Sequence, residues 1–197
     1  MNNKKILLVG GCGFIGHNLA IHLKKMGADP VIVDSLSVNN MLSFADNDIK
    51  NRKLYSSILN NRIELLDNNK IKLIIQDARD YHAISKIYKD INPDIIIHLA
   101  AVSHANKSNK DPHSTFDHSF RTLENTLDYA KKNKTHTIYM SSSMVYGNFD
   151  SEDVKEDREC KPIGIYGTLK YSGELLVKAY SDVFDLPYTI IRPSALY

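Results

Sequence analysis

The sequence has few cysteines, no long hydrophobic run and no excess of charge of either sign. Its two cysteines, Cys12 and Cys160, are too few for a disulfide framework and lack the spacing of metal ligands. Lys and Arg number 25 against 23 Asp and Glu, and this balance does not favour nucleic acid or an anionic lipid surface. The longest apolar stretch, Ile95 to Val102, is far shorter than the roughly 18 residues of a membrane span. We therefore expect a folded cytoplasmic protein without a metal, membrane or nucleic-acid partner.

Continuous apolar runs alternate along the chain with segments of helical spacing. Runs of this kind are typical of strands buried on both faces of a parallel sheet. They cover Lys5–Val9, Val31–Val33, Leu73–Ile75, Ile95–Ile97, Thr137–Met140 and Tyr188–Ile191. The helical spacing is clearest in Ile15, Leu19, Leu23 and Met26, which form one apolar stripe. The alternation predicts an α/β fold with a doubly wound parallel sheet and helices on both faces.

Two polar stretches interrupt this alternation. Residues 39–69 are rich in Asn and are expected to form a surface excursion that is helical around Arg52–Leu66. Residues 147–161 are expected to form a long loop on the side of the active site. No internal repeat or Gly/Ser linker is present, so we expect a single domain over residues 1–197.

A glycine-rich turn follows the first apolar run directly. It reads Gly10, Gly11, Cys12, Gly13, Phe14, Ile15, Gly16, and a helical segment begins there. Glycine allows a tight turn, close approach of the backbone to a pyrophosphate, and close packing of helix against strand. The free N–H groups of the helix N-terminus then bind the phosphates. A tight turn without a ligand is the alternative interpretation, and the position between strand and helix favours a Rossmann-type dinucleotide site.

An acidic residue closes the second apolar run. Asp34 stands 18 residues after Gly16, near the spacing of the acid that binds the adenosine ribose hydroxyls. A carboxylate there repels the 2′-phosphate of NADP, and neither Lys nor Arg is near it in sequence, so we predict NAD as the cofactor. A strand-end cap is the alternative role of Asp34. Asp77 follows the third run and is expected either to bind the adenine amino group or to stabilise its own loop.

Tyr166 and Lys170 are four positions apart in a segment of helical periodicity through Leu169, Leu176, Tyr180 and Val183. The two side chains therefore lie on one face of a helix and can enter one site. With 11 tyrosines in the chain, a solvated surface pair is the alternative for this spacing taken alone.

The order of these features carries a family resemblance. After the glycine turn and Asp34 come HLAA at His98–Ala101, SSSMVYG at Ser141–Gly147, then Tyr166 with Lys170, and IIRPSALY at Ile190–Tyr197. In this order they resemble the extended short-chain dehydrogenase/reductase family, the NAD-dependent nucleotide-sugar epimerases and dehydratases. The resemblance covers nearly the whole chain and is greatest to members like UDP-glucose 4-epimerase.

The resemblance implies a role for each matched residue. Tyr166 is the expected general base, Lys170 binds the nicotinamide ribose, and Ser142 hydrogen-bonds the reacting sugar oxygen. A tyrosine with a pKa near 10 needs a drop of about 3 pKa units, or about 4 kcal/mol, to act near neutrality. The nearby Lys170 ammonium and the positive nicotinamide ring favour that drop. The expected cofactor-binding residues are Gly10, Gly13, Phe14, Ile15, Gly16, Asp34, Asp77, Ala100 and Lys170.

The residues after Ser142 bear on the reaction. Family dehydratases place Asp-Glu after their catalytic Thr, whereas this chain has Ser143 and Met144. The resemblance therefore favours an epimerase, in which NAD accepts a hydride from a nucleotide sugar and returns it to the opposite face. A dehydratase or reductase of the same family, or a binding module that holds NAD without turnover, stays open.

Two departures from the family accompany the resemblance. Its Asn-Val-x-Gly-Thr stretch reads Ser119, Phe120, Arg121, Thr122, Leu123 here, so Ser119 replaces the Asn. Family members also continue into a smaller C-terminal lobe that binds the nucleotide of the substrate, and residues 1–197 stop where it should start, so we expect a fragment.

The family's dimer interface, a four-helix arrangement, would involve Phe116–Ala130 and Thr168–Phe184, so we expect a homodimer.

Overall fold

The computed structural model describes residues 3–38, 51–103, 105–149 and 153–194. It divides the chain into two compact units, residues 1–100 and residues 101–197. The prediction of one domain over the whole chain stays a prediction. Among the described residues no helix is long and apolar enough to cross a bilayer, and no group of three or more His, Cys, Asp or Glu side chains is placed to hold a metal ion.

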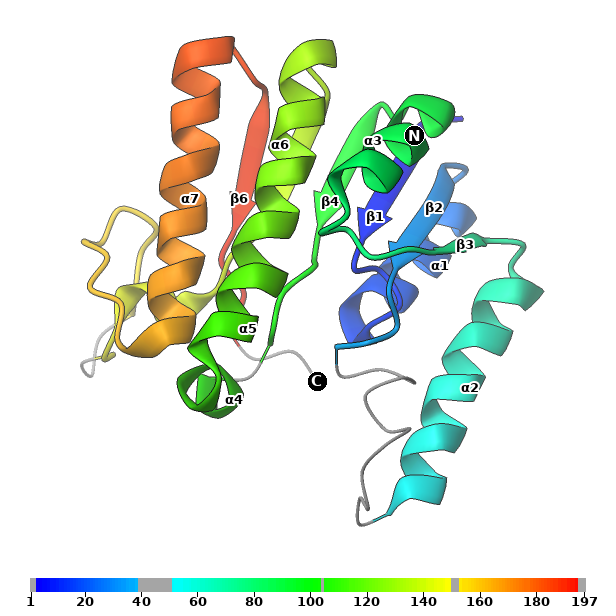
Figure 1. The fold of residues 1–197 in the computed structure, drawn as a ribbon, viewed down its shortest axis with the longest axis horizontal. Helices are drawn as coiled ribbons and strands as arrows, with labels where there is room; N and C mark the ends of the chain where they lie inside the picture. The colour runs from blue at the N-terminus through cyan, green and yellow to red at the C-terminus, as the bar shows by residue number, and fades with distance from the viewer. Residues whose placement is uncertain (1–2, 39–50, 104, 150–152, 195–197) are drawn as a thin grey trace. The chain divides into compact units, whose positions relative to one another are not determined.

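The first unit is a parallel sheet with a helix after each of its first three strands (Figure 1). Its strands are β1 (Lys5–Val9), β2 (Asp29–Asp34), β3 (Lys72–Ile75) and β4 (Ile95–His98), in the order β3-β2-β1-β4. The connecting helices are α1 (Phe14–Lys25), α2 (Arg52–Asn68) and α3 (Tyr81–Ile91). Residues 6–9 of β1 are almost fully buried, as the continuous apolar run predicts. All four strands expected in this unit are confirmed.

The buried face of α1 differs from the predicted stripe. Gly16, His17, Ala20 and Leu23 face inward, whereas Ile15 and Leu19 are half-buried. At Gly16 the helix lies so close to the glycine turn that a Cβ atom would clash with the Gly11 backbone, so a glycine takes the inward position there. Met26 lies at the C-cap, beyond the last helical residue, and is 48% exposed. The predicted stripe is therefore wrong except at Leu23.

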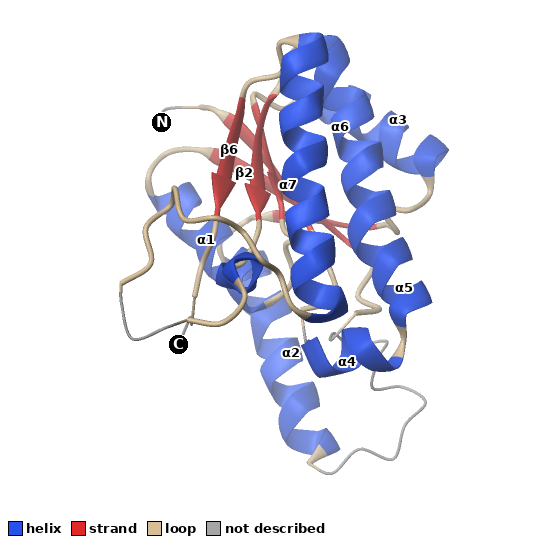
Figure 2. Cartoon of the chain, turned by 90° about the vertical axis from the view of Figure 1, so that its left-hand side faces the viewer, coloured by secondary structure: helices blue, strands red, loops and turns tan. Residues whose placement is uncertain are grey.

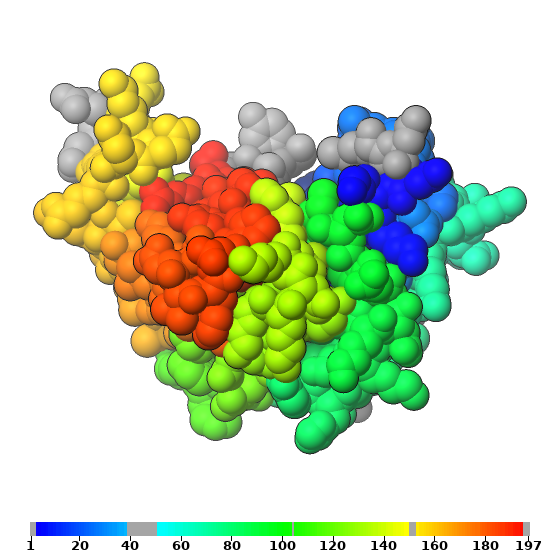
Figure 3. Space-filling model, turned by 90° about the horizontal axis from the view of Figure 1, so that it is seen from above, coloured from blue at the N-terminus to red at the C-terminus, as the bar shows by residue number. Residues whose placement is uncertain are grey.

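The second unit pairs two parallel strands and packs long helices beside them. β5 (His136–Met140) pairs with β6 (Tyr188–Ile191), as the apolar runs predict. The helices are α4 (Ala105–Lys110), α5 (Pro112–Phe116), the π-helical turn η2 (Asp117–Arg121), α6 (Thr122–Asn133), the 3₁₀ turn η3 (Ser143–Tyr146) and α7 (Gly164–Phe184). Figure 2 shows α6 and α7 side by side, and their outer surfaces adjoin in the space-filling view (Figure 3).

Helix α7 buries small and polar residues rather than the predicted periodic apolar ones. Its buried residues are Gly167, Lys170, Gly173, Glu174 and Val177, and Val183 is 71% exposed. A Cβ atom at Gly173 would lie closer to the Tyr139 hydroxyl than any real contact, so α7 packs tightly on β5. This close packing turns one face of α7, including Lys170 and Glu174, into the interior of the second unit.

The two predicted excursions are described in part. The first contains α2, which matches the expected helical stretch, while residues 39–50 lie outside the described residues. The loop expected over residues 147–161 has no helix or strand where it is described, and residues 150–152 lie outside that part of the chain. The end of the Arg-Pro segment, residues 195–197, also lies outside it.

Candidate functional site

The turn after β1 requires glycine for two reasons. Gly10 has a φ of +74°, a conformation that side-chain-bearing residues rarely adopt. A Cβ atom on Gly10 would also lie 2.6 Å from the Cα of Ala100, which follows β4. The turn is held by a 2.8 Å hydrogen bond from the Gly10 N–H to the Val33 carbonyl. Gly10 and Ala100 therefore bring the carboxyl ends of β1 and β4 together, as expected for two residues of one cofactor site.

The N-terminus of α1 is open above this turn. Gly13 is its N-cap residue and no side chain caps the helix, so the first N–H groups, including those of Phe14 and Ile15, lack intrahelical acceptors. A Cβ atom on Gly13 would meet its nearest neighbour, the Gly10 carbonyl oxygen, only at 3.9 Å. At Gly16, by contrast, it would lie 2.3 Å from the Gly11 carbonyl oxygen. The residues present therefore fit a diphosphate, which needs free N–H donors and room beside them.

Asp34 ties the end of β2 to the same turn. Its Oδ2 accepts the Cys12 N–H at 2.9 Å, and its Oδ1 accepts the Leu36 N–H at 2.8 Å. Burial raises the pKa of Asp34, and the two backbone hydrogen bonds offset part of that rise. A carboxylate has about four acceptor positions, so two are left for ribose hydroxyls. Asp34 thus acts as a strand-end cap through these two hydrogen bonds. Its remaining acceptor positions are compatible with the predicted binding of a ribose.

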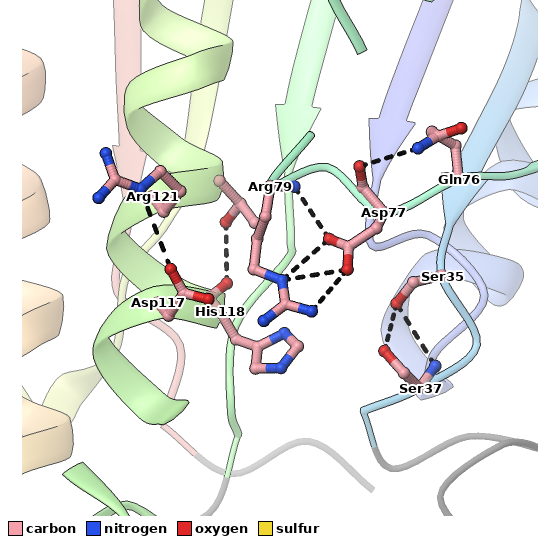
Figure 4. Close-up of polar contacts among 9 residues, drawn as sticks. Ser35, Ser37, Gln76, Asp77, Arg79, Asp117, His118 and Arg121 are labelled. Carbon is pink, nitrogen blue, oxygen red and sulfur yellow. Dashed lines mark hydrogen bonds and ion pairs between the residues drawn. The ribbon is translucent and has the colours of Figure 1, made fainter. Parts of the chain in front are cut away.

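Asp77 is engaged in its own loop (Figure 4). Its carboxylate pairs with the Arg79 guanidinium, with 2.6 Å between Oδ2 and Nη2, and it also accepts the Arg79 N–H at 2.9 Å. These contacts match the loop-stabilising role, and the adenine contact stays a prediction. Figure 4 also shows Ser35 and Ser37 joined by a 2.5 Å hydrogen bond just after Asp34, where no basic side chain follows in sequence.

The three expected catalytic residues lie together in the second unit. Ser142 directly follows β5 as the N-cap of η3, and its Oγ accepts the Met144 N–H at 3.2 Å. Tyr166 lies in the first turn of α7, and the Ser142 side chain is near enough to lower the pKa of its phenol. The Lys170 ammonium lies 6.0 Å from the centroid of the Tyr166 ring. The surface-pair interpretation of Tyr166 and Lys170 is wrong for Lys170, which is only 6% exposed.

The pKa values in this cluster differ from the simple expectation. Burial raises the pKa of Tyr166, and the Ser142 side chain reverses only part of this rise. Burial also lowers the pKa of Lys170 to about 8. Its ammonium donates to the Met140 carbonyl oxygen at 2.6 Å. The protein alone therefore does not lower the pKa of Tyr166 towards neutrality, because the effect of burial outweighs that of Ser142.

Ser119 holds the position where the family has Asn. It lies in η2, and its Oγ accepts the Val102 N–H at 3.2 Å. The shorter side chain thus still contacts the segment that follows β4. The replacement of Asn by Ser119 therefore keeps a hydrogen bond to the Val102 backbone.

The sequence reasoning missed Glu174 and gave no role to Arg192. Glu174 is fully buried on α7, one turn after Lys170, and it pairs with Arg192 beyond β6 at 2.6 Å. The position of Glu174 could have been predicted from its spacing, because an acid four positions after Lys170 falls on the same helix face as Lys170 and Tyr166.

Comparison with known proteins extends these observations. The family model described as "NAD dependent epimerase/dehydratase family" matches residues 6–197. Protein CapI of Staphylococcus aureus is 31% identical over 195 residues, which are 98% of this chain and 54% of CapI. A putative UDP-glucose 4-epimerase of Methanocaldococcus jannaschii is 29% identical over 98% of this chain and 56% of its own length.

A solved structure shows the same fold. UDP-glucuronic acid 4-epimerase from Bacillus cereus, solved with UDP-glucuronic acid and NAD, aligns with a TM-score of 0.79 at 29% identity. The alignment covers 95% of this chain and 55% of that one, so this chain spans about half the length of the relatives it matches. The predicted fold class, Rossmann-type α/β, is confirmed. The match over almost all of its residues shows that the chain belongs to the NAD-dependent epimerase/dehydratase family.

Proposed function

We propose that this chain is the cofactor-binding and catalytic half of an NAD-dependent nucleotide-sugar epimerase. The observation that carries the proposal is the cluster of Ser142, which follows β5, with Tyr166 and Lys170 on one face of α7, where the Lys170 ammonium lies 6.0 Å from the centroid of the Tyr166 ring. A hydroxyl, a phenol and a buried ammonium in this arrangement suit removal of a proton from a sugar hydroxyl. Relatives named as 4-epimerases of UDP-sugars support the substrate class.

NAD is the proposed cofactor. The open N-terminus of α1 at Gly13 offers donors for its diphosphate, and Asp34 offers acceptors for its adenosine ribose. The carboxylate of Asp34 disfavours the 2′-phosphate of NADP. When bound, NAD supplies the hydride acceptor and a positive charge at its nicotinamide ring.

Tyr166 takes the sugar proton as general base. Burial raises the pKa of Tyr166, and a positive charge beside the phenol, which the nicotinamide ring would supply, would favour its ionised form. Lys170 binds the nicotinamide ribose, and Ser142 donates to the sugar oxygen while its Oγ keeps the Met144 N–H.

Epimerisation is favoured over dehydration by the residues beside Ser142. Elimination of water needs further acid and base groups, whereas Ser143 and Met144 occupy those positions. The Met144 side chain cannot transfer a proton. The Ser143 N–H donates to the Pro193 carbonyl at 2.9 Å, so the backbone at this position is held by the protein itself. A reductase and a non-catalytic NAD-binding module are the remaining alternatives.

The experiment that tests this function uses UDP-glucose with deuterium at the carbon that is oxidised, incubated with the chain and NAD. An epimerase returns the label, so labelled epimer forms without net accumulation of reduced cofactor. Loss of water with transfer of the label within the sugar identifies a dehydratase, and release of reduced cofactor identifies an oxidoreductase. Saturable binding of both NAD and the UDP-sugar without any label transfer identifies the binding module.

We also propose that a second copy of the chain covers one face of the second unit. A cavity of about 570 Å³ opens between the α5–η2 segment and the start of α7, lined by Pro112, Phe116, Arg121, Ile165, Thr168 and Leu169. Phe116 is 46% exposed although it stacks on Phe120, and Arg121 at the rim pairs with Asp117 (Figure 4). These segments overlap the expected dimer helices. Light scattering should give twice the chain mass, and a monomer at micromolar concentration contradicts this.

A further inference from the structure

Glu174 is a buried acid for which the proposed reaction has no direct use. It lies on the same face of α7 as Tyr166 and Lys170, and its side chain is 0% exposed. Its Oε1 accepts Arg192 Nε at 2.8 Å, and its Oε2 accepts Arg192 Nη2 at 2.6 Å. Two parallel N–H donors on one carboxylate fix orientation as well as distance. The pair thus joins α7 rigidly to the segment after β6.

The pair also contacts both ends of the segment that carries Ser142. At one end, the Ser141 Oγ donates to Glu174 Oε1 at 2.6 Å. At the other, Arg192 Nη1 donates to the Tyr146 hydroxyl at 2.8 Å, and the guanidinium carbon lies 4.9 Å from the centroid of that ring. Residues 141–146 are therefore attached to the pair on either side of Ser142.

Backbone hydrogen bonds complete the attachment. The Ser141 N–H donates to the Ile191 carbonyl at 2.8 Å, and the Ser143 N–H donates to the Pro193 carbonyl at 2.9 Å. Arg192 lies between these two acceptors, so the position of its side chain and the position of this backbone are coupled. A shift of Arg192 would be passed directly to the residues flanking Ser142.

Resting on the function proposed above, we propose that Glu174 and Arg192 form a positioning pair that holds the Ser142 hydroxyl against Tyr166. A buried ion pair is weak support for stability, because desolvation offsets its attraction, and apolar replacements of both partners are often tolerated. Here the pair fixes the distance between α7 and the loop that carries Ser142. Helix α7 carries Tyr166 and Lys170.

The test replaces both charges together in the 197-residue chain. The double variant Glu174→Gln/Arg192→Met leaves no unpaired buried charge, so it is expected to fold. The matched control is Asp185→Asn, which breaks an exposed ion pair with Lys134 in the same unit. If the double variant does not unfold cooperatively, Arg192→Lys replaces it, because Lys keeps the charge but loses the fork geometry.

The first readout is hydrogen exchange of a peptide covering residues 141–147. We expect exchange about tenfold faster or more in the double variant, because hydrogen bonds to charged groups are lost, and no change in the control. The second is hydride transfer from a UDP-sugar to bound NAD in a single turnover. The rate of hydride transfer should fall about a hundredfold in the double variant, as it does when reacting groups are misplaced. In a protein that already carries Ser142→Ala, adding the double substitution should not lower the rate further, because both changes act through Ser142.

The outcomes separate this inference from the proposed function. Unchanged exchange at residues 141–147, or a rate loss that is fully additive with Ser142→Ala, overturns the positioning role. Absence of hydride transfer in the unmodified chain, with both NAD and the UDP-sugar bound, counts against the proposed function instead. The exchange readout then decides by itself whether the pair holds the segment, since it needs no substrate or cofactor.

Discussion

Replacement of Lys170 by methionine probes the cluster through its buried charge. The lysine is 6% exposed, and burial lowers its pKa from 10.5 to about 8. The folded protein therefore binds this proton more weakly than the unfolded chain does. Since one pKa unit corresponds to about 1.4 kcal/mol, the charged lysine destabilises the folded chain by about 3 kcal/mol at neutral pH. Methionine removes this cost.

The substitution also removes a hydrogen bond. Lys170 Nζ donates to the Met140 carbonyl at 2.6 Å, and a buried acceptor that loses its donor costs about 1–3 kcal/mol. Subtracting this from the gain leaves Lys170→Met about 1 kcal/mol more stable than the unmodified chain at pH 7. The same variant should lose hydride transfer, because it removes the ammonium 6.0 Å from the Tyr166 ring that we propose to bind the nicotinamide ribose.

The pH dependence gives the sharper result. The unmodified chain gains stability as pH rises through the folded pKa of about 8 towards the unfolded value of 10.5, because over this window the unfolded chain binds more protons at Lys170. The methionine variant lacks this gain. From pH 7 to about 9.5 the unmodified chain should therefore gain about 2 kcal/mol relative to the variant, which reverses their order.

Urea unfolding of both proteins at a series of pH values measures this difference directly. Lys170→Arg is the control, because arginine keeps its charge throughout the range. A difference between the lysine and methionine proteins that stays constant from pH 7 to about 9.5 would refute the reasoning. So would a variant that is several kcal/mol less stable at pH 7.

Three further predictions concern single side chains. Gly13→Ala should fold within about 1 kcal/mol of the unmodified chain, since its Cβ would meet its nearest neighbour only at 3.9 Å. It should nevertheless lose the increase in melting temperature that NAD causes, and an unchanged increase would place the phosphates elsewhere. Gly16→Ala, whose Cβ would lie 2.3 Å from the Gly11 carbonyl oxygen, should fail to fold. Asp34→Ala should lower the melting temperature, because the Cys12 and Leu36 N–H groups lose their acceptor, and should weaken NAD more than NADP in calorimetry. Tyr166→Phe should keep NAD binding but slow hydride transfer by about 10²–10⁴-fold, and a smaller loss in rapid-mixing kinetics would remove Tyr166 as the base.

The features predicted correctly from sequence depend on local pattern. The strands follow from continuous apolar runs, which are typical of a parallel sheet. The predicted burial on both faces holds for β1, whereas the edge strands β3 and β6 are half-buried or exposed. The glycine turn follows from the demands of a tight strand-to-helix connection, and the common face of Tyr166 and Lys170 follows from helical spacing.

The features that were missed depend on tertiary packing. The inward face of α1 includes Gly16, which lies too close to the Gly11 backbone for any side chain, and hydrophobic spacing does not predict such a contact. The pKa of Tyr166 depends on its burial, which no spacing reveals. The pairing of Glu174 with Arg192 joins a helix to a segment beyond the next strand, and a single sequence gives no signal for such a pair.

Titration calorimetry of the 197-residue chain with NAD, and with NADP in the same buffer, tests the central claim most directly. We predict saturable binding of one NAD per chain through the turn at Gly13 and the carboxylate of Asp34. NADP should bind at least about tenfold more weakly, because its 2′-phosphate meets that carboxylate. Absence of saturable NAD binding to the folded chain, or equal binding of NADP, would contradict the assignment of this fold as an NAD site.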